Sequence, residues 1–199
     1  MSARDLWPAV LAHLRGCDAP AAEFLDGLPR EPQERPAPPP ADGFARPVPN
    51  ELDRLADTAP AETRALCAAI AAEAARLSWR SSYTTADVGA FATGYAWAPI
   101  AAPDGPLVIP SGLVCIMHIG PRLHYPPHRH EPEELYAVLA GNAVFSSDRS
   151  PRTRLGPGAL RHHAPYETHS MDTDDSAALV LALWKGSYRK SEIVKTEAT

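Results

Sequence analysis

The spacing of hydrophobic residues along the chain changes near residue 80. Before that point, apolar residues recur every three or four positions, as on one face of a helix, in two sets: Trp7, Val10, Leu11 and Leu14, and then Leu66, Ile70, Ala74 and Leu77. A cap, a first-turn proline and a first-turn acid precede the second set: Thr58, Pro60 and Glu62. The pattern therefore predicts a helix over about residues 59–78 and shorter helical pieces nearer the start.

A proline-rich segment separates these helical parts. Residues 29–49 contain eight prolines, and proline fixes φ and lacks an amide donor. The segment is therefore expected to be an extended connector or strap on the surface, and not a helix or an inner strand. Its prolines and the aromatic residues of the front raise the hypothesis that this region covers the mouth of the part that follows.

After Trp79 the apolar runs become short and alternate with Gly, Pro and Asp-Gly turns. Each run has the length of a strand: Gly94–Ile100, Leu107–Ile109, Leu113–Ile119, Leu135–Ala140, Ala143–Phe145 and Ala177–Trp184. Short strands with turns between them are typical of an all-β sandwich or barrel. We therefore expect three parts: an N-terminal helical extension (1–80), a β-barrel (81–190) and a polar tail (191–199).

The composition narrows the classes of function. The 199 residues carry a net charge of −5 and no basic stripe, which argues against binding of nucleic acid through its phosphates. No apolar run approaches the roughly 18 residues that a membrane helix needs, and the N-terminus lacks the hydrophobic segment of a signal peptide. The three cysteines are odd in number and widely spaced, so we expect no disulfide framework and a cytoplasmic location.

Histidines concentrate in the second half, where seven of the eight lie within residues 118–169. Their most informative arrangement is His128-x-His130 followed by Glu134. Alternate residues of a strand point to one side, so His128 and His130 share a face. A turn before Glu134 lets this residue and Tyr136 share a face of the next strand. Two strands joined in this way aim imidazole and carboxylate ligands into one space, as a divalent metal ion requires.

A later histidine completes the expected ligand set. His169 follows the turn signal of Pro165 and can bring a fourth ligand from a neighbouring strand. Such ligands accept several divalent ions, so we expect one ion of Zn, Fe, Mn, Co or Ni. The remaining clustered histidines are expected to be structural, exposed or merely beside the ligands: His118, His124, His162 and His163.

These motifs resemble those of the cupin superfamily. The HxHxxxE motif, with a glycine seven residues after the glutamate (Gly141), matches the first cupin motif in full. The second motif matches more loosely through Pro157–Gly158 and His169, and the resemblance covers about residues 85–190. It implies a mainly β fold, namely a cupin-type antiparallel β-barrel (jelly-roll-like) with the metal inside, here preceded by an N-terminal α-helical extension.

Within that superfamily, the chain resembles the cupin-type dimethylsulfoniopropionate lyases of bacteria. The resemblance rests on HxHxxxExY, which ends at Tyr136, on Tyr125, on the stretch HHAPYETHSM and on Trp184 in the last strand. It implies that a small zwitterionic carboxylate, dimethylsulfoniopropionate, is split by β-elimination into acrylate and dimethyl sulfide.

The aromatic residues then receive expected roles. Tyr136 is the expected base, because it lies beside the metal ligands and a nearby cation favours the phenolate. Tyr125 is the second choice, or a hydrogen-bond partner that orients the base. The leaving group is a sulfonium cation, which an aromatic face attracts, and Trp184 is the leading candidate for that wall. Weaker candidates lie nearer the front of the barrel: Tyr83, Trp79 and Tyr95.

Other interpretations stay open. Tyr136, Tyr125 and Trp184 could each be packing residues. The same ligands would serve another cupin metalloenzyme, such as a dioxygenase or isomerase on a small carboxylate, and an Fe(II) dioxygenase needs no tyrosine base. A non-catalytic metal- or ligand-sensing cupin would be expected to carry a recognised DNA- or partner-binding module, and the front shows neither a basic recognition helix nor long heptads. Exposed sheet edges can pair between chains, so a homodimer is left open.

Overall fold

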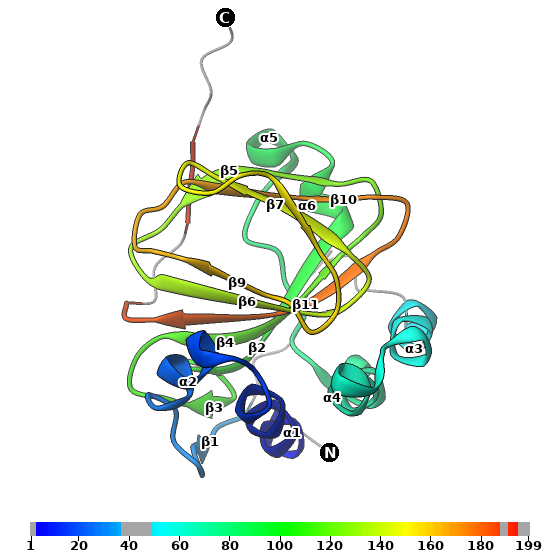
Figure 1. Ribbon diagram of the computed structural model, residues 1–199. Coiled ribbons are helices and arrows are strands. Elements are labelled where there is room, and N and C mark those ends of the chain that lie inside the picture. Colours follow the sequence, from blue (N-terminus) through cyan, green and yellow to red (C-terminus); the bar gives the residue numbers. More distant parts are fainter. Residues whose placement is uncertain (1–2, 37–48, 188–190, 195–199) are drawn as a thin grey trace, which may run out of the picture.

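The computed structural model describes residues 3–36, 49–187 and 191–194. Helices dominate the first part of the chain and strands the rest (Figure 1). The helices are α1 (Ala3–Arg15), α2 (Ala19–Leu25), α3 (Pro49–Thr58), α4 (Ala61–Glu73, continued by a 3-10 turn at Ala74–Arg76), α5 (Thr85–Val88) and α6 (Phe91–Gly94). In the described ranges, no helix has both the length and the apolar character needed to cross a membrane.

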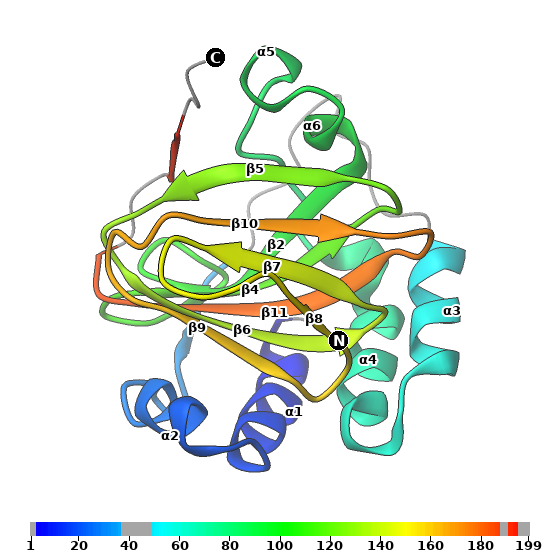
Figure 2. The same cartoon turned by 45° about the horizontal axis from the view of Figure 1, so that its top comes forward.

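The strands of the described residues form two sheets, of seven and five strands, that face each other (Figure 2). The larger sheet has the order β1-β3-β2-β4-β11-β6-β9, and the smaller has the order β12-β5-β10-β7-β8. Neighbouring strands are antiparallel except β2 and β3. The bounds are β1 Gln33–Glu34, β2 Tyr95–Ala102, β3 Leu107–Val108, β4 Leu113–Ile119, β5 His124–Arg129, β6 Glu133–Ala140, β7 Ala143–Ser147, β8 Thr153–Leu155, β9 Leu160–His163, β10 His169–Thr173, β11 Ala178–Lys185 and β12 Glu192–Ile193.

The seven-stranded sheet is covered on both faces, which explains the continuous apolar runs of its central strands. Every residue of β4 is buried. Alternate side chains of this strand, such as Cys115 and Met117, point between the sheets, and those between them, such as Ile116, point to the opposite face. The same alternation in β6 places Tyr136 between the sheets and Leu135 on the far side, as the sequence predicted.

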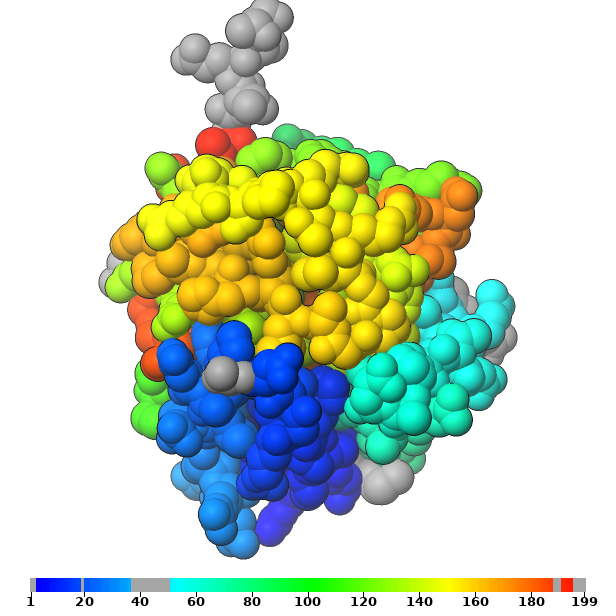
Figure 3. Space-filling view, viewed as in Figure 1, coloured from blue at the N-terminus to red at the C-terminus, as the bar shows by residue number. Residues whose placement is uncertain are grey.

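Helices α1 to α4 cover the outer face of the larger sheet (Figure 1). Trp7 and Leu14 of α1, together with Ile70 of α4, share one hydrophobic core with Leu135 and Leu181 of the sheet. In the space-filling view, the blue and cyan helices lie directly against the yellow and orange strands (Figure 3). The helices are therefore part of the same folded body as the barrel.

The observed elements agree with most of the predicted ones. The helix expected over residues 59–78 is α4 with its 3-10 turn, and the strand predicted at Leu113–Ile119 is β4. The predicted fold class, a mainly β barrel with N-terminal helices, is confirmed. Residues 37–48 of the expected proline strap lie outside the described residues, while β1 before them pairs with β3 at the edge of the larger sheet.

Several segments differ from expectation, among them the short helices α5 and α6, which lie inside the expected barrel region (81–190). Helix α3 directly follows the proline-rich segment, where no helix was predicted. In the expected polar tail, β12 pairs with β5 opposite Arg129 and His128, so the described part of this tail is the edge strand of the smaller sheet.

Candidate active site

Three histidines meet between the two sheets. His128 lies in β5, His130 in the turn after it, and His169 at the start of β10. His169 and His128 are direct Cα partners across the β10–β5 pair, which brings their side chains together. One ring nitrogen from each of the three histidines lies within 4.8 Å of the others, and all three side chains are buried.

A β-bulge explains how β5 directs two neighbouring side chains inward. Tyr125 and His128 are three residues apart, and strict alternation would place them on opposite faces. Their partners His169 and Met171 are only two residues apart, so the register shifts between them. The prolines of the intervening Pro126–Pro127 pair donate no ladder hydrogen bond, which suits them to this irregular position. The bulge therefore brings Tyr125 against His128, with ring centroids 3.8 Å apart.

The hydrogen bonds of the three histidines indicate which ring nitrogen carries the proton and which one is unprotonated. In each ring Nδ1 lies 2.8–2.9 Å from a backbone carbonyl oxygen, namely that of Pro126 for His128, Pro132 for His130 and Glu167 for His169. A carbonyl only accepts, so Nδ1 carries the proton in every case. Each Nε2 is thereby left as the nitrogen that can bind a metal ion.

Glu134 adds a carboxylate to this cluster. Its Oε2 lies 3.0 Å from Nε2 of His130 and 3.0 Å from Nε2 of His169. Its Oε1 accepts a hydrogen bond of 2.6 Å from Nε1 of Trp184. The sheet register explains these neighbours, because Glu134 of β6 is the Cα partner of Trp184 on β11 and of His163 on β9.

The charges of the cluster are coupled. Burial alone would raise the pKa of Glu134, but the neighbouring His130 and His169 hold that pKa well below its usual value. Burial lowers the pKa of His130, and Glu134 more than offsets this, so the net shift is upward. Burial and the nearby His169 hold the pKa of His128 well below its usual value, so this ring is neutral.

The donor set fits a divalent metal ion. Nε2 of His130 and Nε2 of His169 both lie 3.0 Å from the same oxygen, Oε2 of Glu134, and both rings are buried. With the proton on Nδ1, these imidazole nitrogens and the carboxylate oxygen are all acceptors, so a cation between them would satisfy all of them. Three imidazole nitrogens and one carboxylate oxygen are the ligands that Zn, Fe, Mn, Co and Ni accept.

A cavity of about 310 Å³ adjoins the cluster. Of the residues predicted for the site, His128, Glu134 and the following aromatic residues line it: Tyr83, Tyr95, Tyr125, Tyr136 and Trp184. Further lining residues, which the sequence analysis did not assign to the site, are Ser82, Trp97, Leu113, Cys115, Met117, Ala182 and Ser191. The cavity is thus rich in aromatic rings, and two of the candidate metal ligands, His128 and Glu134, form part of its wall.

Trp79 lies elsewhere. Its side chain is buried in the core between the helices and the outer face of the larger sheet. Its indole N–H donates a hydrogen bond of 2.8 Å to the carbonyl oxygen of Ala74. The structure therefore gives Trp79 a packing position and does not place it at the cavity.

The two candidate tyrosines have different surroundings. The hydroxyl of Tyr125 is 2.7 Å from that of Tyr83. The ring of Tyr136 lies 6.2 Å from that of His169, between centroids. Burial holds the pKa of both phenols well above its usual value, and the Glu134 carboxylate adds to this at Tyr136. Without a bound cation, both phenols are therefore neutral.

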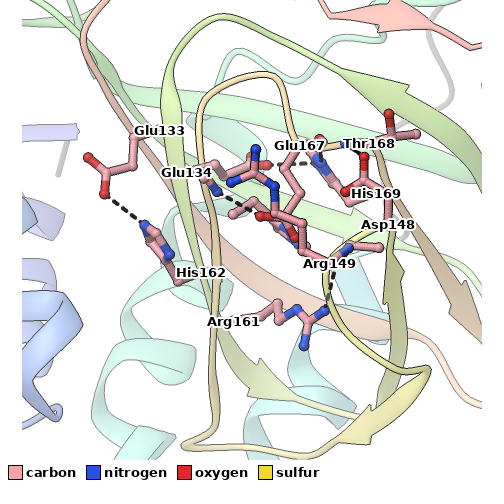
Figure 4. A network of polar contacts seen from close by, with 12 residues as sticks. Glu133, Glu134, Asp148, Arg149, Arg161, His162, Glu167, Thr168 and His169 are labelled. Atoms are coloured by element: carbon pink, nitrogen blue, oxygen red, sulfur yellow. Dashed lines mark hydrogen bonds and ion pairs between the residues drawn. The ribbon is translucent and has the colours of Figure 1, made fainter.

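Three of the other histidines differ in their surroundings. His124 and His162 are exposed and pair with Asp172 and Glu133, the latter pair being visible in Figure 4. His163 is fully buried, and its ring stacks on that of His169 at 4.0 Å. A position beside the ligands was among those expected for His163. Its side chain points inward because His163 is the Cα partner of Glu134, and no local motif indicates this pairing.

The barrel with histidines and a glutamate inside defines the class of protein as a cupin. A cupin-2 domain from Rhodospirillum rubrum superposes with a TM-score of 0.50 at 16% identity, over 61% of this chain and 77% of that one, which supports the fold. A family model described as dimethylsulfoniopropionate lyase matches residues 34–181. The chain belongs to this dimethylsulfoniopropionate lyase family, as its motifs predicted.

Known relatives agree with this membership. The dimethylsulfoniopropionate lyase DddQ of Ruegeria pomeroyi is 32% identical over 127 residues, which are 63% of either protein. The putative lyase DddL of Cereibacter sphaeroides is 30% identical over 145 residues, 71% of this chain and 60% of that protein. The alignments thus span somewhat less than two thirds of these relatives. The crystal structure of DddQ from Ruegeria pomeroyi matches with a TM-score of 0.77 and 25% identity, covering 99% of this chain and 98% of that one.

Proposed function

We propose that this protein cleaves dimethylsulfoniopropionate into acrylate and dimethyl sulfide at the cavity described above. The observation that carries the proposal is the convergence of the three histidine rings and Glu134 in the barrel, next to the cavity that Tyr136 lines, in a chain of this family. His128, His130, His169 and Glu134 would hold one divalent metal ion. Such an ion supplies positive charge that binds the substrate carboxylate and favours the phenolate of a neighbouring tyrosine.

In this proposal Tyr136 is the base. Its phenolate oxygen, which a bound cation would favour, takes the proton from the carbon next to the substrate carboxylate and becomes a neutral phenol. The electron pair of that C–H bond forms the new carbon–carbon double bond, and the C–S bond breaks with its electrons leaving on sulfur. The products are acrylate and neutral dimethyl sulfide, so atoms and charge balance. Tyr136 suits this role because it lies on the inner face of β6, two residues from Glu134.

Tyr125 then acts as an orienting residue. Its ring is fixed between Phe91 and His128, with centroid distances of 4.3 Å and 3.8 Å. Its hydroxyl is already hydrogen-bonded to Tyr83. A side chain held this firmly is well placed to donate to a bound carboxylate, and poorly placed to move toward a proton elsewhere in the cavity.

The aromatic walls of the cavity suit a sulfonium cation. Tyr83, Tyr95, Trp97 and Trp184 all line it. A cation over an aromatic face gains about 0.5–2 kcal/mol, the larger value when water is excluded. The substrate class that fits this cavity is therefore a small carboxylate with a methylated cationic end.

The proposal is tested by supplying the purified, metal-loaded protein with dimethylsulfoniopropionate. Dimethyl sulfide in the headspace and acrylate in solution should appear in equal amounts. Tyr136→Phe should lower kcat by about 10²–10⁴-fold, the usual contribution of a general base. The bound metal, measured by elemental analysis, should be unchanged.

The outcomes separate the alternatives. No dimethyl sulfide above background with Zn, Mn or Fe(II) would refute the lyase function. Oxygen uptake without sulfide release would favour a dioxygenase. Retained activity in Tyr136→Phe, together with its loss in Tyr125→Phe, would transfer the role of base to Tyr125.

A further inference from the structure

Trp184 makes a contact that its expected role as a cavity wall does not require. Its indole Nε1 donates a hydrogen bond of 2.6 Å to Oε1 of Glu134. Its ring centroid lies 4.5 Å from that of His130, with 35° between the ring planes. One side chain thus touches two of the proposed metal ligands.

The two oxygens of the Glu134 carboxylate face different partners. Oε1 faces the indole, whereas Oε2 is the oxygen that lies 3.0 Å from both His130 and His169. The carboxylate is only 2% exposed. A charge-assisted hydrogen bond in such a buried place is strong and directional, so it resists rotation of the carboxylate.

We propose that Trp184 is a positioning residue for the metal centre. It holds Glu134 so that Oε2 alone is presented to the metal ion, and thereby leaves room beside the ion for the substrate carboxylate. The inference rests on the metal site of the proposed function and assigns a role to a residue outside the ligand set. Hydrogen bonds to metal ligands of this kind contribute about 10–100-fold to metal affinity.

The sheet register makes this geometry a property of the fold. Trp184 and Glu134 are direct Cα partners on the adjacent antiparallel strands β11 and β6. Directly opposite residues have Cβ atoms about 4.5–5.5 Å apart, which is close enough for the two side chains to meet. The indole is therefore placed beside the carboxylate before any metal binds.

Trp97 provides a matched control. It also lines the cavity, and its indole N–H also donates a hydrogen bond to a side chain, at 2.9 Å to Oγ of Ser82. The guanidinium of Arg80 lies 5.0 Å from its ring centroid. None of the contacts found for Trp97 in the described residues involves a proposed metal ligand. Replacing either tryptophan by phenylalanine removes one indole donor from the same cavity.

The experiment measures Zn(II) affinity of the full-length protein after removal of metal, by competition with a coloured chelator. Trp184→Phe should bind Zn(II) about 10–100-fold more weakly than wild type. The Zn(II) affinity of Trp97→Phe should stay within about threefold of the wild-type value, because Trp97 makes no hydrogen bond to a proposed metal ligand. The visible absorption of bound Co(II), which depends on coordination number, should change in Trp184→Phe and not in Trp97→Phe.

A third variant distinguishes loss of the N–H donor from a general disturbance of the fold. Trp184→Gln restores an N–H donor without the ring and should bind Zn(II) more tightly than Trp184→Phe. Wild-type affinity in Trp184→Phe, or equal weakening in the Phe and Gln variants, would overturn the proposal and leave Trp184 as a cavity wall. These measurements use metal alone, so their result is independent of whether dimethylsulfoniopropionate is cleaved.

Discussion

His163 lies directly against the metal-ligand candidate His169 and is fully buried. Its ring is stacked on that of His169, and its Nδ1 is 3.1 Å from Oε1 of Glu167. Glu167 also accepts a hydrogen bond from the backbone N–H of Ala164. Burial and the nearby His169 lower the pKa of His163 to about 4. A neutral, buried imidazole beside the ligands therefore forms part of the native core.

This buried histidine predicts a pH dependence of stability. The unfolded chain protonates His163 below its ordinary pKa of about 6.5, whereas the folded protein resists protonation until about pH 4. The free energy of unfolding should therefore be highest above pH 6.5. It should fall by up to roughly 3 kcal/mol as pH decreases from 6.5 to 4. Urea denaturation of the metal-free protein at several pH values measures this fall.

The variants His163→Gln and His124→Gln separate this effect from the general loss of charge pairs in acid. His163→Gln should flatten the slope between pH 6.5 and 4, whereas His124→Gln, at an exposed ion pair, should keep it. An unchanged slope in His163→Gln would contradict the assignment.

At the scale of single residues, the sequence could identify those site residues that belong to a short local motif. The spacing of His128, His130 and Glu134 predicted that these side chains meet, and the structure brings them together with His169. The expected reason was wrong for His130, which lies in the turn after β5 and not on the strand with His128. Trp97 lines the cavity through the register between β2 and β4, which links positions about twenty residues apart. Such register is set by the whole barrel, so no local pattern could indicate it.

The turn between β6 and β7 shows what the motif glycine does. Gly141 has a φ of 71°, which other residues adopt only at a cost. A Cβ at this position would also overlap the carbonyl oxygen of Ala177, which belongs to the backbone leading into β11. The glycine thus permits both the turn and the close approach of two strands.

Gly141→Ala should therefore lower the free energy of unfolding by about 2–4 kcal/mol, from the strained φ and the forced backbone shift. Gly158→Ala is the control, because its φ of 84° is also positive but its Cβ would meet only the flexible Glu62 side chain at 3.5 Å. Gly158→Ala should lower the free energy of unfolding by about 1–2 kcal/mol. Thermal or urea unfolding gives both values, and equal losses would show that the approach of Ala177 is unimportant.

Helices and strands could be predicted where the local hydrophobic pattern matches the way the segment packs in the fold. Strand β4 was predicted with its observed bounds because turns enclose its apolar run. Helix α3 was missed because it begins at the last proline of the proline-rich segment, which hid its start. Strand β5 runs through Pro126–Pro127, where the sequence analysis expected no continuous apolar run, and its bulge depends on pairing with β10. Strand β12 is only two residues long and exists through its partner.

In the whole molecule, helices α1 to α4 lie on one face of the seven-stranded sheet (Figure 1, Figure 2), and the side chains that line the cavity are on its other face. Helices α1 to α4 bury the outer face of this sheet, while the lining residues of the cavity begin at Ser82. Helices α1 to α4 therefore do not form a cover over the cavity, which corrects the hypothesis of an N-terminal cover for these helices. The shared core supports one barrel with a helical extension.

The most direct test of the account is the metal dependence of dimethyl sulfide release by the whole protein. Wild-type protein is stripped with a chelator, checked by elemental analysis, and assayed with dimethylsulfoniopropionate before and after return of Zn, Mn or Fe(II). We predict background release from the stripped protein, recovery with at least one ion, and no recovery in His169→Ala. Full release from protein shown to contain no metal would contradict the proposed function.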